Sequence, residues 1–215
     1  MKETMTVHKG LAELKILGDR IGEAIREASF VVANKHSNTK ISGESISDYS
    51  AAAKTAYQSI TSLINRRNAI KRSITRSNAE TKVTIAGVEY TVAEAIDMKS
   101  TGMSFTKTLA DTIASQLKAA KVTADRNNGE RLDDRADEYV RSMYSGSDMK
   151  NMADELKKVR EDFVTAQTVE IVDPINAAEK VDMMTKKYDA FMAEVDSALS
   201  VSNALTTIEV EYETV

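Results

Sequence analysis

The residues that decide the fold lie at 49–74, where the sequence reads YSAAAKTAYQSITSLINRRNAIKRSI. One set of positions recurs there in alternating steps of four and three, the spacing of a helix face that packs lengthwise on a partner. These positions are Tyr49, Ala53, Ala56, Ile60, Leu63, Arg67, Ile70 and Ile74. The spacing predicts a long helix, and Ser47 or Asp48 is placed to cap its first turn.

A second face of the same period precedes this one in the chain. Its positions are Val7, Leu11, Leu14, Gly18, Ile21, Ile25, Ala28 and Val32. A polar loop at 34–43 separates the two faces. Two helices of matching length joined by a short loop favour a long antiparallel helical hairpin, similar to a coiled coil, over residues 5–80.

Short segments of alternating polarity predict small β elements farther along the chain. Residues 83–91 alternate about a central Ala-Gly pair, which is typical of a β-hairpin. Residues 169–172 and 207–212 each predict one strand. These strands lie next to helix ends in the sequence, so a single minor sheet at one end of a helical bundle is expected to gather several of them.

Helix boundaries are also marked in the sequence. Thr91 and Glu94 have the spacing of a capping box, which starts a short helix that ends near residues 101–102. Ser104 is expected to cap the next helix, and Pro174 to open the last one. The expected buried face of that last helix contains Val181, Met184, Tyr188, Phe191, Val195 and either Ala198 or Leu199.

The expected architecture is therefore mainly α, in one elongated helical domain over residues 1–215. Its parts are a helical hairpin at 5–80, a β-hairpin and short helix at 81–100, helices at 104–168, and a strand, helix and strand at 169–215. The composition agrees with long helices, because only 5% of the residues are aromatic and the chain has a single proline.

Composition also excludes several kinds of chemistry. The chain has no cysteine, which excludes disulfides, thiol catalysis and cysteine-ligated metals. It has two histidines, His8 and His36, too few for a histidine-rich metal site. No Gly-rich phosphate loop and no serine nucleophile with a partner is recognisable. We expect a protein that is not an enzyme and has no cofactor.

Charge and hydropathy indicate the expected surroundings. The net charge is −4 with a pI near 5.4, which argues against bulk binding of nucleic acid. No apolar segment is long enough for a membrane span, and residues 1–6 do not resemble a secretion signal. The expected location is the cytoplasm, without a membrane partner.

The most unusual segment is basic and lies on the second long helix. Residues 49–79 contain no acid, and they contain six bases. The candidate ligand-binding residues are Arg66, Arg67, Asn68, Lys71, Arg72 and Arg76. They suggest a site for phosphate or a nucleotide, because arginine offers paired donors to such anions. Arg67 is expected on the buried face, where it would need an anionic partner.

Three sets of charged or sulfur-containing residues have both a structural and a functional interpretation. The bases on this helix can instead pair with acids of the protein, such as Glu209, Glu211 or Asp196. Four acids near residue 135 are weak candidates for a metal site, because arginines interleave with them as on a salt-bridged face. These acids are Asp133, Asp134, Asp137 and Glu138. A methionine cluster is expected to be adaptable core, and it consists of Met149, Met152, Met183, Met184 and Met192.

Three segments resemble a family of small helical bacterial proteins known as septicolysin-like. They are ITSLINRRN at 60–68, the hairpin and Thr-x-x-Glu-Ala helix at 83–95, and EVDSALSVSN at 194–203. Similar proteins of uncertain function occur in tailed bacteriophages. The resemblance covers about half of the chain, and residues 69–77 lengthen the second helix relative to the family. It implies a helical fold and suggests a phage origin.

Together these features favour a self-associating binding protein that holds an anionic small molecule or nucleotide at the basic helix. Sequestration of a host defence signal would suit such a protein if it is phage-encoded. The first alternative is a structural component of a virion or assembly that makes only protein contacts. The second is a pore-forming or lytic protein, although no segment suited to insertion stands out. Self-association is expected because several long apolar faces exceed what a thin bundle can bury.

Overall fold

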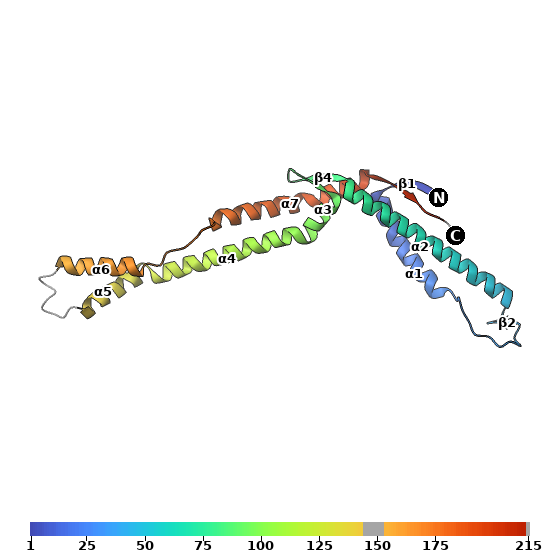
Figure 1. Ribbon diagram of the computed structural model, residues 1–215, viewed down its shortest axis with the longest axis horizontal. Helices are drawn as coiled ribbons and strands as arrows, with labels where there is room; N and C mark the ends of the chain where they lie inside the picture. The colour runs from blue at the N-terminus through green and yellow to red at the C-terminus, as the bar shows by residue number, and fades with distance from the viewer. Residues whose placement is uncertain (144–152, 214–215) are drawn as a thin grey trace. The chain divides into compact units, whose positions relative to one another are not determined.

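The computed structural model describes residues 1–143 and 153–213 and is mainly α, as predicted (Figure 1). Its helices are α1 (Val7–Glu27), α2 (Ile46–Glu80), α3 (Val92–Asp97), the π-helix η1 (Met98–Gly102), α4 (Met103–Asn127), α5 (Glu130–Met143), α6 (Ala153–Gln167) and α7 (Ala177–Leu205). Its strands are β1 (Lys2–Thr6), β2 (Lys40–Ile41), β3 (Glu44–Ser45), β4 (Lys82–Ile85), β5 (Val88–Thr91) and β6 (Thr207–Glu211).

The residues group into two compact units where the sequence analysis expected one domain. Unit 1 contains Met1–Gly102 and Ala190–Val215, and unit 2 contains Met103–Asp189. The strands form three separate antiparallel pairs, β1–β6, β2–β3 and β4–β5. The sequence analysis expected several strands to gather in one sheet. That prediction was wrong, because each of these sheets contains two strands only.

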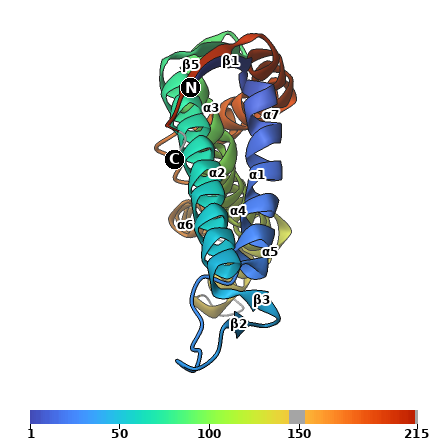
Figure 2. The ribbon, with the colours of Figure 1, turned by 90° about the vertical axis from the view of Figure 1, so that its right-hand side faces the viewer.

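The first two long helices of unit 1 pack side by side as a hairpin (Figures 1 and 2). The predicted face of α2 is confirmed except at Arg67, with Ile60, Ile70 and Ile74 buried. The cap of α2 is Ser45, one turn earlier than predicted, because the β2–β3 turn delivers its hydroxyl to the main-chain N–H of Asp48 at 3.1 Å. The hairpin agrees with the prediction, but its helices do not match in length, because α1 has 21 residues and α2 has 35.

The predicted face of α1 is confirmed at Val7 and Ile21, which are buried, and wrong at the positions between and after them. The helix buries Gly10 and Leu17, whereas Leu11 and Ile25 are 42% and 48% exposed. Gly10 explains the change, because a Cβ atom there would lie 3.2 Å from Ile74 of α2. The absence of a side chain lets the helices and β6 approach closely at this position. The helix also ends at Glu27, so Ala28 and Val32 lie beyond it.

Strand β1, near the first residue, pairs with β6, near the last one, and was not predicted. It pairs with β6 over five residues, from Lys2 opposite Glu211 to Thr6 opposite Thr207. The strand expected at 207–212 is confirmed by β6. Ile208 and Val210 of β6 contribute to the core between α1 and α2.

The hairpin expected at 83–91 is confirmed by β4 and β5, and the capping box follows it. Thr91 accepts a hydrogen bond from the main-chain N–H of Glu94, whose carboxylate accepts one from the main-chain N–H of Thr91. The short helix does not stop near residues 101–102. It continues as η1, and α4 begins at Met103, so Ser104 lies inside that helix and does not cap it.

In unit 2, α5 and α6 pack together through charged and aromatic side chains. Arg160 of α6 lies 2.7 Å from both Asp133 and Asp137 of α5. The rings of Tyr139 and Phe163 stack with centroids 4.6 Å apart. The acids near residue 135 therefore form the salt-bridged face, and within the described residues no group of acids and histidines could hold a metal ion.

Residues 169–172 do not form the predicted strand. No strand of the described residues pairs with this segment, and the Asn128 side chain instead bonds both the main-chain N–H and the carbonyl of Val169, each at 2.9 Å. The last helix begins after Pro174, at Ala177, whose main-chain N–H is bonded by the Asp173 carboxylate.

The buried face predicted for α7 is confirmed, and Phe191 and Val195 are its most buried residues. In the expected methionine cluster, Met183 is 55% exposed while Met184 and Met192 are half-buried, and Met149 and Met152 lie outside the described residues. No helix in the described part of the chain is both long and apolar enough to cross a membrane.

Candidate functional site

Arg66 is the one predicted site residue that points into the protein. Its Nε donates to Glu13 at 2.5 Å, and its guanidinium lies 2.7 Å from Glu3 and donates a hydrogen bond to the Tyr212 hydroxyl oxygen. The guanidinium also lies 5.1 Å from the centre of the Tyr212 ring. These contacts, above all the hydrogen bond to Glu13, raise the pKa of Arg66 further above its ordinary value. Arg66 therefore ties α2 to α1, β1 and the segment after β6.

The acids that were expected to pair with the basic helix have other partners or none. Glu209 pairs with Lys2 at 2.8 Å, and Asp196 pairs with Lys99 at 2.5 Å. The hydrogen bond from Lys2 holds the pKa of Glu209 below its ordinary value. The internal partners of Arg66 come from α1 and β1, which the sequence analysis did not connect with this helix.

Arg67 is exposed, so its expected place on the buried face was wrong. Its guanidinium donates to the side chain of Asn68 at 3.1 Å. The long side chain can reach water from its position on the predicted face of α2, which avoids the free-energy cost of burying a charge.

Lys71, Arg72 and Arg76 are exposed, and no ion pair is recorded for them among residues 1–143 and 153–213. Arg72 and Arg76 are four residues apart, as are Arg67 and Lys71. Like charges at this spacing repel by about 0.2–0.5 kcal/mol per pair on an isolated helix. This part of α2 therefore carries positive charge that no acid of the described residues pairs with.

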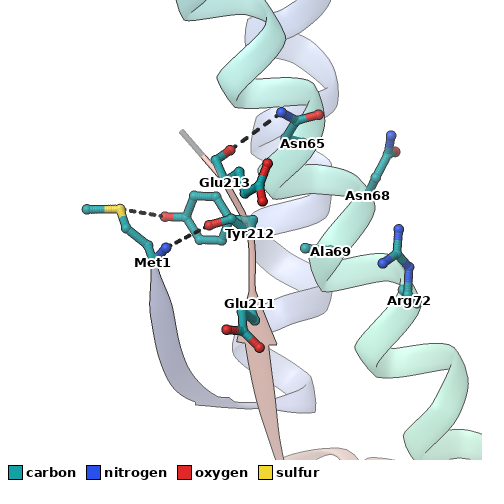
Figure 3. Close-up of a pocket in the computed structure, with 8 residues that line it drawn as sticks. All are labelled: Met1, Asn65, Asn68, Ala69, Arg72, Glu211, Tyr212 and Glu213. Atoms are coloured by element: carbon teal, nitrogen blue, oxygen red, sulfur yellow. Dashed lines mark hydrogen bonds between the residues drawn. The ribbon is translucent and has the colours of Figure 1, made fainter. Parts of the chain in front are cut away.

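Arg72 lines a cleft of about 490 Å³ between α2 and the end of β6 (Figure 3). The lining residues are Met1, Asn65, Asn68, Ala69, Arg72, Glu211, Tyr212 and Glu213. The amino group of Met1 donates to the carbonyl of Tyr212 at 2.7 Å, and the Asn65 amide donates to the carbonyl of Glu213 at 3.4 Å. We call this hollow the Arg72 cleft.

Arg76 lines a second hollow of about 270 Å³, farther along the same groove between α2 and β6. Ser73 lies at its edge and donates its hydroxyl proton to the carbonyl of Glu209 at 2.7 Å. The wall opposite Arg76 is formed by residues 206–209. Arg72 and Arg76, one helical turn apart on α2, thus line two hollows along strand β6.

The Arg72 cleft combines one free guanidinium with two carboxamides and two carboxylates. It can bind an anionic group at Arg72, and its amides and carboxylates can bind donors and acceptors of an attached polar group. Sequence reasoning found Asn68 and Arg72 but missed Asn65 and residues 211–213. The alternation of β6 was visible in the sequence, but nothing in it indicated that α2 would lie beside that strand.

No protein-family model, no curated protein and no solved structure matches this chain.

Proposed function

We propose that the protein is a self-associating, non-enzymatic binding protein that holds an anionic small molecule, such as a nucleotide, between α2 and β6. The observation that carries this proposal is that Arg72 and Arg76 each line a hollow and form no ion pair with an acid of residues 1–143 and 153–213, although Glu211 and Glu213 line the first hollow and Glu80 and Glu209 the second. Arg66, on the same helix, is fully occupied by the protein's own acids. Arg66 therefore leaves the set of ligand-binding candidates, and Arg72 and Arg76 become its main members.

The charge arrangement favours phosphate over a monovalent carboxylate. A guanidinium donates two parallel hydrogen bonds to two oxygens of one phosphate. A phosphate or diphosphate group beside Arg72 and Arg76 would also relieve the repulsion between them. Asn68 and Lys71 lie on the same part of α2, where they add a donor and a positive charge.

The test is isothermal titration calorimetry with pyrophosphate and with nucleoside mono-, di- and triphosphates. We expect binding by the wild type and a loss of at least tenfold in the double variant Arg72→Glu and Arg76→Glu. Lys54→Glu is the control for charge reversal, since it makes one of the two reversals on the same helix but outside the groove; the single variants Arg72→Glu and Arg76→Glu match it in charge. Circular dichroism checks that each variant folds. Equal affinity of the double variant and the wild type, or no binding of any of these ligands, would refute the proposal.

Self-association is supported by exposed apolar side chains in unit 2. Phe105 and Leu109, one turn apart on α4, are 70% and 54% exposed, and Val172 is 88% exposed. Apolar patches of this kind are typical of surfaces that bind protein. Native mass spectrometry at micromolar concentration is expected to give an oligomer, and the same spectrum reveals any retained ligand. A monomer at that concentration would contradict this part of the proposal.

The same exposed residues favour a second candidate, a structural protein of a virion or assembly that makes only protein contacts. It predicts an oligomer or polymer without added mass and copies of the chain in purified particles. Binding of a phosphate ligand that depends on Arg72 and Arg76 would decide for the first candidate. Sequestration of a signalling nucleotide would then be its role if the chain is phage-encoded.

A further inference from the structure

Strand β6 has one edge that faces β1 and one that faces α2. The pairing of Val7 N–H with the Thr206 carbonyl, and of Tyr212 N–H with the Met1 carbonyl, fixes which residues of β6 bond to β1. Because a strand alternates the direction of its main-chain groups, the even-numbered residues face β1. The N–H and C=O groups of Glu209 and Glu211 therefore point to the other edge.

Helix α2 covers this second edge at two points. The Ser73 hydroxyl bonds the carbonyl of Glu209 at 2.7 Å, and the Asn65 amide bonds the carbonyl of Glu213 at 3.4 Å. Glu211 lies between these two contacts and lines the Arg72 cleft. Among the residues that the structure describes, none is recorded as bonding the main chain of Glu211. One donor and one acceptor are thus left free side by side.

We infer that the main chain of Glu211 binds the hydrogen-bonding edge of a nucleobase whose phosphate binds Arg72. The N–H of Glu211 donates to a ring nitrogen or carbonyl oxygen, and its C=O accepts from an amino or ring N–H group. A nucleobase presents such a donor and acceptor next to each other on one planar edge. This inference rests on the proposed function and adds to it the part of the ligand that gives selectivity.

The contacts of α2 disfavour a peptide strand as the occupant. Addition of a strand needs a run of free main-chain groups along an edge. Ser73 and Asn65 occupy the carbonyls of Glu209 and Glu213, on both sides of Glu211, so an added strand could not form a continuous ladder there. The edge of a nucleobase needs only the one donor and one acceptor of Glu211.

The charges in the cleft also favour a ligand with one neutral end. Glu211 and Glu213 line the cleft together with Arg72, so a bare polyphosphate would lie close to two carboxylates. Figure 3 draws the Glu211 carboxylate and the Arg72 guanidinium apart, and no ion pair joins them. A nucleotide can place its phosphate at Arg72 and its uncharged base at the strand.

The test compares ribose 5-phosphate with the four common nucleoside 5′-monophosphates by calorimetry. We expect at least one nucleotide to bind tenfold or more tightly than ribose 5-phosphate. Methyl groups that block the hydrogen-bonding edge of its base should remove this gain. If ribose 5-phosphate binds as tightly as every nucleotide, the inference is overturned while the proposed function stands. If none of these phosphates binds, the proposed function fails as well.

A pair of variants tests the main-chain contact directly. Glu211→Pro removes an N–H that the β1–β6 ladder does not use, together with the carboxylate, which Glu211→Ala removes alone; proline is tolerated at such edge positions. It should reduce the nucleotide's gain over ribose 5-phosphate to about onefold, whereas Glu211→Ala should keep it. A gain that survives in a folded Glu211→Pro variant contradicts the inference. If that variant does not fold, the methylated bases decide.

Discussion

Unit 1 and unit 2 bury very different side chains. The largest fully buried residues of unit 1 are Phe191, Ile70, Ile85, Val195 and Val210. The buried residues of the described part of unit 2 are Met103, Ala110, Ala124, Leu132, Ala136 and Ala177. Since each buried methylene contributes about 0.8 kcal/mol, an alanine-rich interior stabilises far less than one of Phe, Ile and Val. The described interior of unit 2 therefore contributes less free energy of burial than that of unit 1.

Two arginines on one helix of unit 1, α2, also differ strongly in their surroundings. Arg66 is 25% exposed and has two carboxylate partners, whereas Arg72 is exposed and has none recorded in the described residues. Six positions on α2 separate a structural contact from a candidate ligand site. Side-chain type did not decide between these roles; the neighbouring elements did.

The largest expected effect comes from a pair of phenylalanines, one in each unit. Phe191 is 1% exposed and meets the Tyr90 ring edge-on with centroids 5.7 Å apart, so Phe191→Ala should lower the free energy of unfolding by about 3–5 kcal/mol. Phe105→Ala, at a 70% exposed position, should change it by less than about 0.5 kcal/mol. Urea unfolding at low protein concentration measures both. Equal losses would break the comparison of the two units.

The next effect sharpens the comparison of arginines. Arg66→Ala leaves Glu3 and Glu13 without their partner in a half-buried place. We expect a loss of about 2 kcal/mol, between the values for exposed and fully buried pairs. The neighbouring Arg67→Ala should cost less than about 0.5 kcal/mol, because that side chain is exposed. A similar loss in both variants, measured by chemical unfolding, would show that Arg66 does not hold the elements together.

A smaller effect is expected at the capping box of unit 1. Thr91→Ala removes the acceptor for the main-chain N–H of Glu94 and should cost about 1 kcal/mol. Thr55→Ala, at an exposed position inside α2, is the control and should be neutral or slightly stabilising, since alanine favours helix. Thermal unfolding of the three proteins gives the ranking. A cost at Thr55 equal to that at Thr91 would exclude the cap as the cause.

The smallest effect is a change in the pH dependence of stability. The main-chain N–H of Thr91, followed by its hydroxyl, holds the pKa of Glu94 below the ordinary value of 4.5. Glu94 therefore stabilises the fold above that value, and its contribution is lost as the pH falls through the lower native pKa. Glu94→Gln should flatten the decline in stability between neutral pH and pH about 3, measured by urea unfolding. Glu23→Gln, at an exposed position in α1, should leave the decline unchanged.

Much of the local structure could be predicted from the sequence, because local spacing determines it. The α2 face, the β4–β5 hairpin, the Thr91 cap and the α7 face depend on residues close together in the chain. The register of α1 could not be predicted, because Leu11 and Gly10 both belong to acceptable helical faces. A close approach by Ile74 selected the face with Gly10.

The candidate site shows the same division. The acid-free, basic character of residues 49–79 of α2 was visible in the sequence and suggested an anion site. The sequence could not show that the Arg66 side chain turns inward or that the Arg67 side chain stays in water. It also gave no sign of the β1–β6 pairing, because the two strands come from opposite ends of the chain.

The sequence by itself thus determined most of the helices, the β4–β5 turn, the Thr91 cap, and an unusual concentration of positive charge on α2. Only the tertiary structure decided which charges are paired, which strand edge is open, and which residues meet in the Arg72 cleft. The physical reason is that hydrogen bonding and side-chain periodicity within a helix are local. The partner of a charge or of a strand edge, by contrast, is set by whichever distant segment packs beside it.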